Sequence, residues 1–447
     1  MRSQEMKRSK SRGRAIAAAA VSLVAAALVL SGCTSGAASA GGAPSASPTS
    51  QRGVHLTFLN QSRGQEAALN DLAKQYGEKT GVIVTIDTPG PVDYLPKLQA
   101  DAQSKQMPDI YSSFNATSMA PFYKAGWAMD LTKELKAGWS KNFTPEVITL
   151  ATFAKGNNLG VKPGIYTVHW ETQSYGVIAD AANSGMKADK APKTLSDLAS
   201  QLAASNKSPN GGFSVAASLT PQFVQYLASN WLTDAQINDT FAGKYKWTSD
   251  GWAKAFQFLA DLKKQGAIQG GALPGGASDN PTVETNFFTK HSVGTIFDAS
   301  PGVSVAHKTA PDYTSFFSLP IPKALDAKYT PRSPGVPGKG AVINPRGEHV
   351  QASLDFVKWL TEPAQQAYFA KQAYIIPTSP SLLSSGAKLP DTLTGFAEGT
   401  KKQQVIPNTF SPQVTDVIVR DTQSLVLGQM TVKELLADVQ NAQDASQ

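Results

Sequence analysis

The sequence is almost free of cysteine: its 447 residues contain one, Cys33. A lone thiol cannot form an intramolecular disulfide, so the fold must be stabilised by burial of apolar side chains. Histidine is also scarce, with five residues that stand singly along the chain. No HxxxH or HExxH spacing occurs, and cysteine ligands are lacking, so we expect neither a metal nor a cofactor.

Sequence motifs of several enzyme classes are missing as well. The chain has no P-loop and no GxGxxG pattern, and the segment 294–300 is not a GxSxG nucleophile elbow. We therefore expect a protein that is not an enzyme. A secreted glycosidase stays open as an alternative, because two carboxylates can meet in a folded cleft without any local motif.

Clustered positive charge is absent from most of the chain, although the net charge is +7. Residues 1–32 carry six Lys or Arg and one Glu, which leaves about +2 for all that follows. Nucleic-acid binding needs clustered cations that neutralise phosphates, so we expect no nucleic-acid partner.

One apolar run exists, and it lies at the start. A basic segment precedes the uncharged stretch 15–30, and Leu30, Ser31, Gly32 and Cys33 follow. This pattern is typical of an export signal over 1–32, and its end resembles a bacterial lipobox in which Cys33 is lipidated. A plain secretory signal with a coincidental cysteine is the alternative. Residues 33–53, rich in Ser, Ala, Gly and Pro, then predict a flexible linker. It would join the lipid on Cys33 to the folded part of the protein, which we expect outside the cytoplasm.

After the linker, the pattern predicts an α/β protein. Residues 54–58 alternate as a strand, 69–76 have helical spacing, and 82–86 form a β-branched strand. Strand, helix and strand within about thirty residues make a βαβ unit of a parallel sheet. Ligands bind at the carboxyl ends of such strands, which is where residues 60–65 lie.

Further segments continue the alternation. We expect strands at 108–111, 160–166 and 175–179, and helices that begin at Thr194 and Thr431 with capping patterns. Apolar helical faces recur around Trp252 and Leu354, and residues 332–339 predict an exposed connector.

Several segments, in this order, resemble the extracellular solute-binding proteins of ABC importers, in the sugar-binding group that includes maltose-binding protein. They are 30–33 (LSGC), 107–110 (MPDI), 164–166 (GIY), 175–177 (YGV), 191–198 (APKTLSDL), 287–290 (FFTK), 293–300 (VGTIFDAS), 352–362 and 375–377 (IIP). The chain departs from the family at 176–180, where an asparagine is common, and at 301–302, where many members have tryptophan.

The resemblance implies a type II two-lobed fold of two discontinuous α/β domains that close on a solute. It places crossings near 168–175, 297–300 and 335–340. The expected lobe 1 is then 54–170 with 299–337, and the expected lobe 2 is 171–298 with 338–445.

Candidate solute-binding residues follow from position and chemistry, since hydroxyl-rich solutes need planar hydrogen-bonding groups and aromatic faces. They are Asn60, Gln61, Arg63 and Gln65 after the first strand, Ser113 and Asn115 after the next, Trp170 and Glu171 at the first crossing, Asp298 and Ser300 at the second, and Trp231 and Phe410. Each has a structural alternative, which we favour for Trp231. Lys339 can reach the mouth of the cleft, but an exposed lysine is the safer interpretation.

The sequence therefore predicts a lipid-anchored, monomeric receptor that captures a sugar and delivers it to the transmembrane subunits of an ABC permease. A polyol, a glycerol phosphodiester or a peptide is the alternative solute. A phosphate would require Arg63, the one evident phosphate-binding candidate.

Overall fold

A computed structural model describes residues 51–275, 279–385 and 389–447. The export signal, Cys33 and most of the expected linker lie outside the described residues. Within those residues, no helix combines the length and the apolar character needed to cross a membrane.

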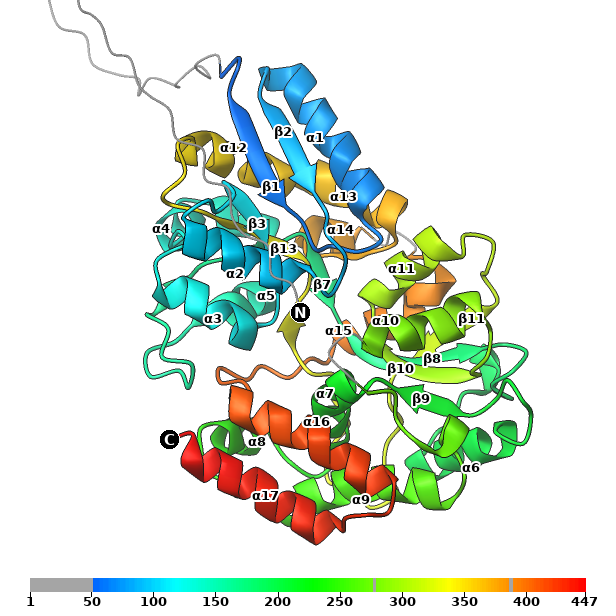
Figure 1. The fold of residues 1–447 in the computed structure, drawn as a ribbon. Coiled ribbons are helices and arrows are strands. Elements are labelled where there is room, and N and C mark those ends of the chain that lie inside the picture. Colours follow the sequence, from blue (N-terminus) through cyan, green and yellow to red (C-terminus); the bar gives the residue numbers. More distant parts are fainter. Residues whose placement is uncertain (1–50, 276–278, 386–388) are drawn as a thin grey trace, which may run out of the picture. The chain divides into compact units, whose positions relative to one another are not determined.

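Strands and helices alternate along the described chain (Figure 1). The strands are β1 (His55–Leu59), β2 (Ile83–Asp87), β3 (Ile110–Ser112), β4 (Thr152–Phe153), β5 (Gly164–Ile165), β6 (Val168–His169), β7 (Glu171–Gln173), β8 (Tyr175–Asp180), β9 (Phe213–Val215), β10 (Thr295–Ala299), β11 (Phe316–Leu319), β12 (Val336–Pro337), β13 (Gly340–Ile343) and β14 (Ile376–Pro377). The α-helices are α1 (Glu66–Thr80), α2 (Tyr94–Ser104), α3 (Ala116–Lys124), α4 (Thr132–Lys136), α5 (Pro145–Ala151), α6 (Leu195–Ser205), α7 (Thr220–Ala228), α8 (Asp234–Phe241), α9 (Asp250–Lys264), α10 (Asp279–Glu284), α11 (Pro301–Thr309), α12 (Val350–Leu360), α13 (Pro363–Ala373), α14 (Pro380–Ser384), α15 (Thr394–Thr400), α16 (Pro412–Val426) and α17 (Val432–Ala445). Short 3₁₀ or π turns are η1 (Trp139–Asn142), η2 (Ala188–Lys190), η3 (Ala217–Leu219), η4 (Gln269–Gly271), η5 (Thr285–Thr289) and η6 (Asp391–Leu393).

The first lobe is built on a five-stranded sheet with the order β2-β1-β3-β13-β6. Strand β1 runs parallel to β2 and β3, whereas β13 is antiparallel to β3 and β6. Helices α1, α12 and α13 contribute to the core on one face of this sheet, and α2 and α3 to the core on the other. The predicted βαβ unit is thus confirmed, and the loop 60–65 follows the carboxyl end of β1.

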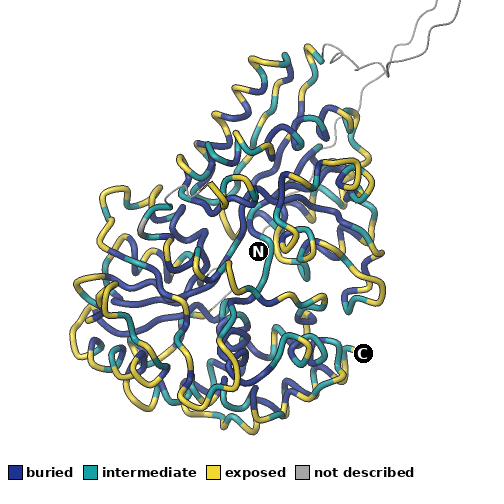
Figure 2. Tube along the Cα trace, turned by 180° about the vertical axis from the view of Figure 1, so that it is seen from behind, coloured by how far each residue is buried: buried dark blue, intermediate teal, exposed yellow. Residues whose placement is uncertain are grey.

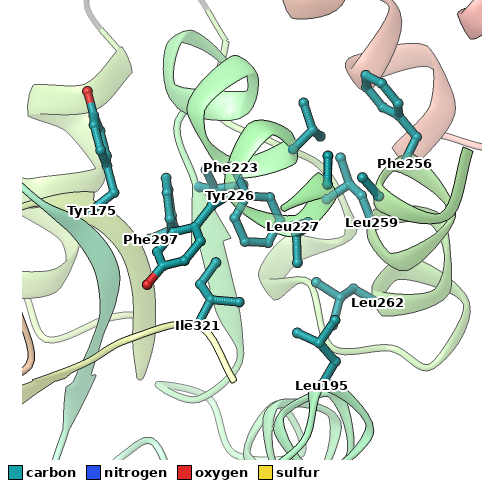
Figure 3. Packing of buried hydrophobic residues seen from close by; sticks show 14 of the residues in the cluster. Tyr175, Leu195, Phe223, Tyr226, Leu227, Phe256, Leu259, Leu262, Phe297 and Ile321 are labelled. Carbon is teal, nitrogen blue, oxygen red and sulfur yellow. The ribbon is translucent and has the colours of Figure 1, made fainter. Parts of the chain in front are cut away.

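The second lobe is built on a four-stranded sheet with the order β11-β8-β10-β9. Its larger core packs α6, α7, α9, α16 and α17 against one face, and a smaller core places α10, α11 and α15 on the other. Figure 3 shows part of the larger core, where Phe223 and Tyr226 of α7 lie between Phe297 of β10 and the side chains of α9. In Figure 2 the strands of both sheets are mostly buried, and exposed segments lie on the helices and loops around them.

A three-stranded sheet, β12-β7-β14, carries the chain between the lobes, and we call it the hinge sheet. Strand β7 follows β6 of the first lobe and precedes β8 of the second, so the crossing expected at 168–175 is confirmed. Strand β12 precedes β13 of the first lobe, which matches the crossing expected at 335–340.

The crossing expected at 297–300 is wrong, and it changes the lobe boundaries. Strand β10 ends at Ala299, and α11 then packs back on the second lobe through Val303 and Ala306. Strand β11 pairs with β8 in the second sheet, while β13 lies in the first sheet. The segment 299–337 therefore belongs mainly to the second lobe, and 340–373 to the first. The third hinge strand is β14, which pairs with β7.

Local sequence signals place two helix starts correctly. Thr194 and Thr431 each form a complete capping box, with Asp197 and Glu434 respectively. The expected strand over 160–166 is shorter than predicted, because only Gly164 and Ile165 pair, with β4.

Candidate functional site

Polar side chains from both lobes and from the hinge sheet come together beside the loop that follows β1. Gln61, Arg63 and Gln65 come from this loop, Glu171 and Lys339 from the hinge region, and Glu284 and Asp298 from the second lobe. We call these seven residues the inter-lobe cluster. The loop after β1 lies more than a hundred positions before the other members in the sequence, so only the fold brings them together.

Arg63 connects the two lobes directly. Its Nη1 and Nη2 donate to Glu284 Oε2 and Oε1 at 2.6 and 3.1 Å. The Arg63 side chain is 28% exposed and that of Glu284 is 2% exposed. Next to it, Glu66 Oε1 accepts from Lys308 Nζ of α11 at 2.7 Å. The loop after β1 and the start of α1 are therefore tied to α10 and α11 by two ion pairs.

The same loop approaches α11 so closely that only glycine fits at position 64. Gly64 has a φ of +81°, and a Cβ there would lie 2.4 Å from the carbonyl carbon of Ser304. Any larger residue would meet both backbone strain and a clash with backbone atoms. The glycine lets the lobes touch where Arg63 and Glu66 form their ion pairs.

Gln65 links the first lobe to the hinge strand β7. Its Nε2 donates to Glu171 Oε2 at 2.9 Å, and its Oε1 accepts from Trp170 Nε1 at 2.9 Å. The Trp170 ring is fully buried and stacks on Phe369, with centroids 5.4 Å apart. Trp170 thus orients Gln65 from within the core and presents no exposed ring face to a solute.

Lys339 lies between β12 and β13 and contacts both sides of this arrangement. Its backbone N–H donates to Glu171 Oε2 at 3.3 Å, and its Nζ donates to Gln61 Oε1 at 3.2 Å. Gln61 Nε2 in turn donates to the carbonyl oxygen of Ser113 at 2.6 Å. The expectation of an exposed lysine at position 339 is wrong, because the side chain turns inward to the cluster.

Burial changes the acid–base properties of the cluster. It raises the pKa of the Glu171 carboxyl to about 7, although the Lys339 ammonium and the Gln65 amide act in the opposite direction. It lowers the pKa of Lys339 to about 8, against the effect of the Glu171 carboxylate. Burial and the neighbouring Glu284 carboxylate together raise the pKa of Asp298. The site therefore holds groups that change charge near neutral pH.

Several buried polar atoms of this region have no hydrogen-bond partner among the described residues. Glu66 Oε2 and Asn280 Oδ1 are two of them, and four others are Glu171 Oε1, Asp298 Oδ2, Ser62 Oγ and Ser113 Oγ. Buried polar atoms are normally paired, and each unpaired one carries a desolvation cost. The four atoms of Glu171, Asp298, Ser62 and Ser113 come from the first lobe, the hinge strand and the second lobe, so a ligand that paired with them would contact all three parts.

The remaining candidates make hydrogen bonds within the protein, and a ligand-binding role for them stays a prediction. Asn60 is buried, and its Oδ1 accepts from Ser62 N and Ser112 Oγ. Asn115 caps α3 through Ser118 N. Ser300 N donates to the Ser174 carbonyl at 2.8 Å, which attaches the end of β10 to the turn between β7 and β8.

Two aromatic candidates lie in the core of the second lobe. Trp231 donates from Nε1 to Asp326 at 3.1 Å and is buried among that core. Phe410 packs on Phe241 with centroids 4.4 Å apart. Neither is part of the inter-lobe cluster, and a ligand-stacking role for them stays a prediction.

A second contact between the lobes involves α3 and the segment 408–410. Thr117 Oγ1 donates to the Phe410 carbonyl at 3.0 Å, and Asn158 N donates to Asn408 Oδ1 at 3.2 Å. Phe114, just before α3, is 42% exposed and follows Ser113 directly. Sequence reasoning named neither Phe114 nor Glu284 as a candidate. The position of Phe114 after the MPDI strand was an available signal, whereas nothing local marks Glu284.

The fold agrees with a known family. The family model for bacterial extracellular solute-binding proteins matches residues 71–393. The chain belongs to this family. No curated protein matches the sequence at a significant level.

Solved structures of the same fold are numerous. The structure is similar to an ABC-transporter solute-binding protein of Thermotoga lettingae TMO bound with α-D-tagatose, with a TM-score of 0.71, 19% identity, and coverage of 88% of this chain and 100% of that one. It is also similar to the maltose/maltodextrin-binding domain of Bdellovibrio bacteriovorus bound to maltotriose, with a TM-score of 0.66, 16% identity, and coverage of 88% and 99%. It is also similar to a protein from work on xylan utilization by Caldanaerobius polysaccharolyticus, with a TM-score of 0.70, 16% identity, and coverage of 87% of this chain and 99% of that one. At these identities the likeness is one of fold.

Within the described ranges, no three His, Cys, Asp or Glu side chains are grouped as metal ligands. Of the carboxyl groups in the inter-lobe cluster, Glu284 accepts from Arg63, and Glu171 accepts from Gln65 and from the backbone N–H of Lys339.

Proposed function

We propose that this solute-binding protein captures a saccharide at the inter-lobe cluster and delivers it to the transmembrane subunits of an ABC importer. The observation that carries the proposal is the set of buried polar atoms without partners, which come from both lobes and the hinge strand. Saccharide hydroxyls both donate and accept hydrogen bonds, so they can satisfy carboxylate oxygens and serine hydroxyls together. Structural neighbours bound with tagatose, maltotriose or stachyose support a saccharide.

Closure of the lobes follows from where these atoms lie. A solute can shift the balance between an open and a closed form only through contacts that differ between them. A solute can contact Asp298 of the second lobe together with Ser62 and Ser113 of the first lobe only when the two lobes approach each other. Binding therefore favours the closed form, and the closed form is what a permease would recognise.

Phe114 provides the apolar side of the proposed site. It follows Ser113, whose hydroxyl is unpaired, and it precedes Thr117, which touches the second lobe. An exposed ring at this place can pack on the C–H face of a sugar. We assign it as a stacking residue in preference to Trp170, Trp231 and Phe410, which are buried.

The proposal also includes a lipid anchor at Cys33 and a monomeric, extracytoplasmic receptor. The lipobox-like sequence at 30–33 supports the anchor, and family membership supports the location. Replacement Cys33→Ser should release the protein from membranes, whereas Ser39→Ala in the neighbouring linker should not. Intact-mass measurement of the membrane-bound form should show the added lipid.

Titration calorimetry against neutral mono- and oligosaccharides tests the binding proposal. We expect at least one saccharide to bind with a Kd near 1 μM, about −8 kcal/mol, which a few satisfied hydrogen bonds and one ring contact can supply. The saccharide should be recovered unchanged, because the protein binds and does not catalyse. Failure of all saccharides to bind, or turnover of a chromogenic glycoside, would contradict the proposal.

A further inference from the structure

The inter-lobe cluster contains ionisable side chains of both signs. Three carboxyl groups, Glu171, Glu284 and Asp298, stand against two cations, Arg63 and Lys339. The cluster therefore has no excess of cations. The groups that can bind a ligand are those that lack a partner within the protein.

Both cations are already engaged within the protein. Arg63 uses Nη1 and Nη2 on the carboxylate of Glu284, in the two-point geometry that a phosphate or carboxylate ligand would otherwise use. Lys339 donates from Nζ to Gln61 Oε1, and its charge lies beside Glu171. An anionic solute would have to displace Glu284 from Arg63 and leave a carboxylate that is 2% exposed without its partner.

The carboxyl oxygens that lack partners favour a solute that donates hydrogen bonds over a solute that carries negative charge. Glu171 Oε1 and Asp298 Oδ2 are carboxyl oxygens, both buried, and neither has a hydrogen-bond partner among the described residues. The nearby amide of Asn280 donates to Glu284 Oε1 at 3.1 Å. Both oxygens can accept hydrogen bonds from a solute. The pKa of Glu171 is about 7, so at pH 7.5 its carboxyl is largely ionised and repels an anionic solute, most strongly where water is excluded.

Resting on the proposed function, we propose that the site selects saccharides without negative charge and rejects their uronate and phosphate counterparts. Hydroxyl or amino hydrogens of the solute donate to Glu171 and Asp298, and the serine hydroxyls adapt as donors or acceptors. Arg63 acts as a tie between the lobes and not as an anion receptor. A glycerol phosphodiester is therefore disfavoured as the solute.

Matched ligand pairs test this selectivity by calorimetry at pH 7.5 and constant ionic strength. Glucose is compared with glucuronate and glucose 6-phosphate, galactose with galacturonate, and neutral xylose oligosaccharides with their acidic forms. We expect a neutral member to bind and each acidic counterpart to bind at least a hundredfold more weakly. An acidic member that binds as tightly as its neutral parent overturns the inference and leaves the proposed function standing. If no member binds, the proposed function fails.

Two near-isosteric variants locate the selectivity in the cluster. Glu171→Gln removes a carboxyl that is largely ionised at pH 7.5 and should narrow the gap between neutral and acidic ligands about tenfold. Asp298→Asn removes a carboxyl whose pKa is raised by burial and by the Glu284 carboxylate, so it should narrow the gap less. Asp261→Asn, a carboxylate of α9 that contacts Gln257, is the matched control and should leave the gap unchanged. Thermal melting confirms that each variant is folded, and Glu171→Gln carries the test if Asp298→Asn does not fold. A gap that stays the same in the folded cluster variants overturns the inference.

Discussion

Arg63 of the first lobe and Glu284 of the second are joined by two hydrogen bonds, although 221 positions separate them in the sequence. One partner is almost fully buried and the other keeps partial contact with solvent. The pair therefore stabilises the arrangement in which the lobes are in contact, and part of its Coulomb energy is screened.

Replacement of Arg63 by Met should favour the open form. The variant leaves the buried Glu284 carboxylate without its counter-charge and with only the Asn280 amide as a donor, which should cost about 1–2 kcal/mol in the lobe–lobe contact. Spin labels at Lys74→Cys and Lys264→Cys, both exposed and in different lobes, in a Cys33→Ser background report the distance by electron resonance. The distance distribution of the solute-free protein should shift to longer values.

The control for this measurement is Arg420→Met. Arg420 also pairs with a carboxylate, that of Asp421, but the pair lies within α16 of the second lobe. It should leave the distances unchanged. Equal distributions for Arg63→Met and the unchanged chain would show that the ion pair does not hold the lobes together.

Glu171→Gln should change how stability depends on pH. The folded-state pKa of Glu171 is raised to about 7 from the ordinary 4.5, so the folded protein holds this proton between those pH values more tightly than the unfolded chain does. The free energy of unfolding contributed by Glu171 is then largest below pH 4.5 and falls as the pH rises to about 7. Such a shift corresponds to about 3 kcal/mol at most.

His169 acts in the opposite direction over nearly the same range. Burial lowers its pKa to about 4, so its contribution to stability rises with pH between about 4 and 6.5. The quantity to measure is therefore the difference in unfolding free energy between Glu171→Gln and the unchanged chain, by urea titration from about pH 4 to 8. The variant should gain relative stability as the pH rises through 4.5 to 7. A difference that does not vary with pH would contradict the burial of an ionisable Glu171.

The sequence predicts the local elements of this fold well because their signals are local. The β1–α1–β2 unit and the capping boxes at Thr194 and Thr431 need only periodicity and a side chain three residues away. The loop after β1 is likewise predictable as part of the site, because strand ends meet at one edge of a parallel sheet.

The lobe boundaries and the roles of single side chains depend on contacts that no local pattern encodes. Whether the chain crosses at Ser300 or turns back depends on the apolar face of α11 and on Ser174, 126 positions away. The sequence predicts that Trp170 stacks on a solute, but Phe369 covers its ring. An indole suits a core and a sugar site equally well, so the sequence cannot separate the two.

Trp170→Phe tests whether Trp170 acts on the site by orienting Gln65. The substitution keeps most of the ring and removes the donor to Gln65 Oε1, at a cost of about 2 kcal/mol in stability. Trp252→Phe is the matched control, since its Nε1 donates to Thr240 within the second lobe. Both variants should lower Tm by similar amounts, but only Trp170→Phe should weaken saccharide binding, because Gln65 loses its orientation toward Glu171. Equal affinities in the two variants would remove Trp170 from the site.

Phe114→Ala should weaken saccharide binding while leaving the fold intact. The ring is 42% exposed, so its removal costs little packing, but a sugar face that stacks on it loses a contact of about 1 kcal/mol, or roughly fivefold in Kd. Tyr329→Ala is the control, an aromatic ring 37% exposed that belongs to the loop after β11. Calorimetry with the tightest neutral saccharide should show the loss for Phe114→Ala alone, with unchanged Tm. Phe114→Tyr should keep the affinity, because a stacking contact requires the ring and not its para hydrogen. An unchanged Kd in Phe114→Ala would place the apolar side of the site elsewhere.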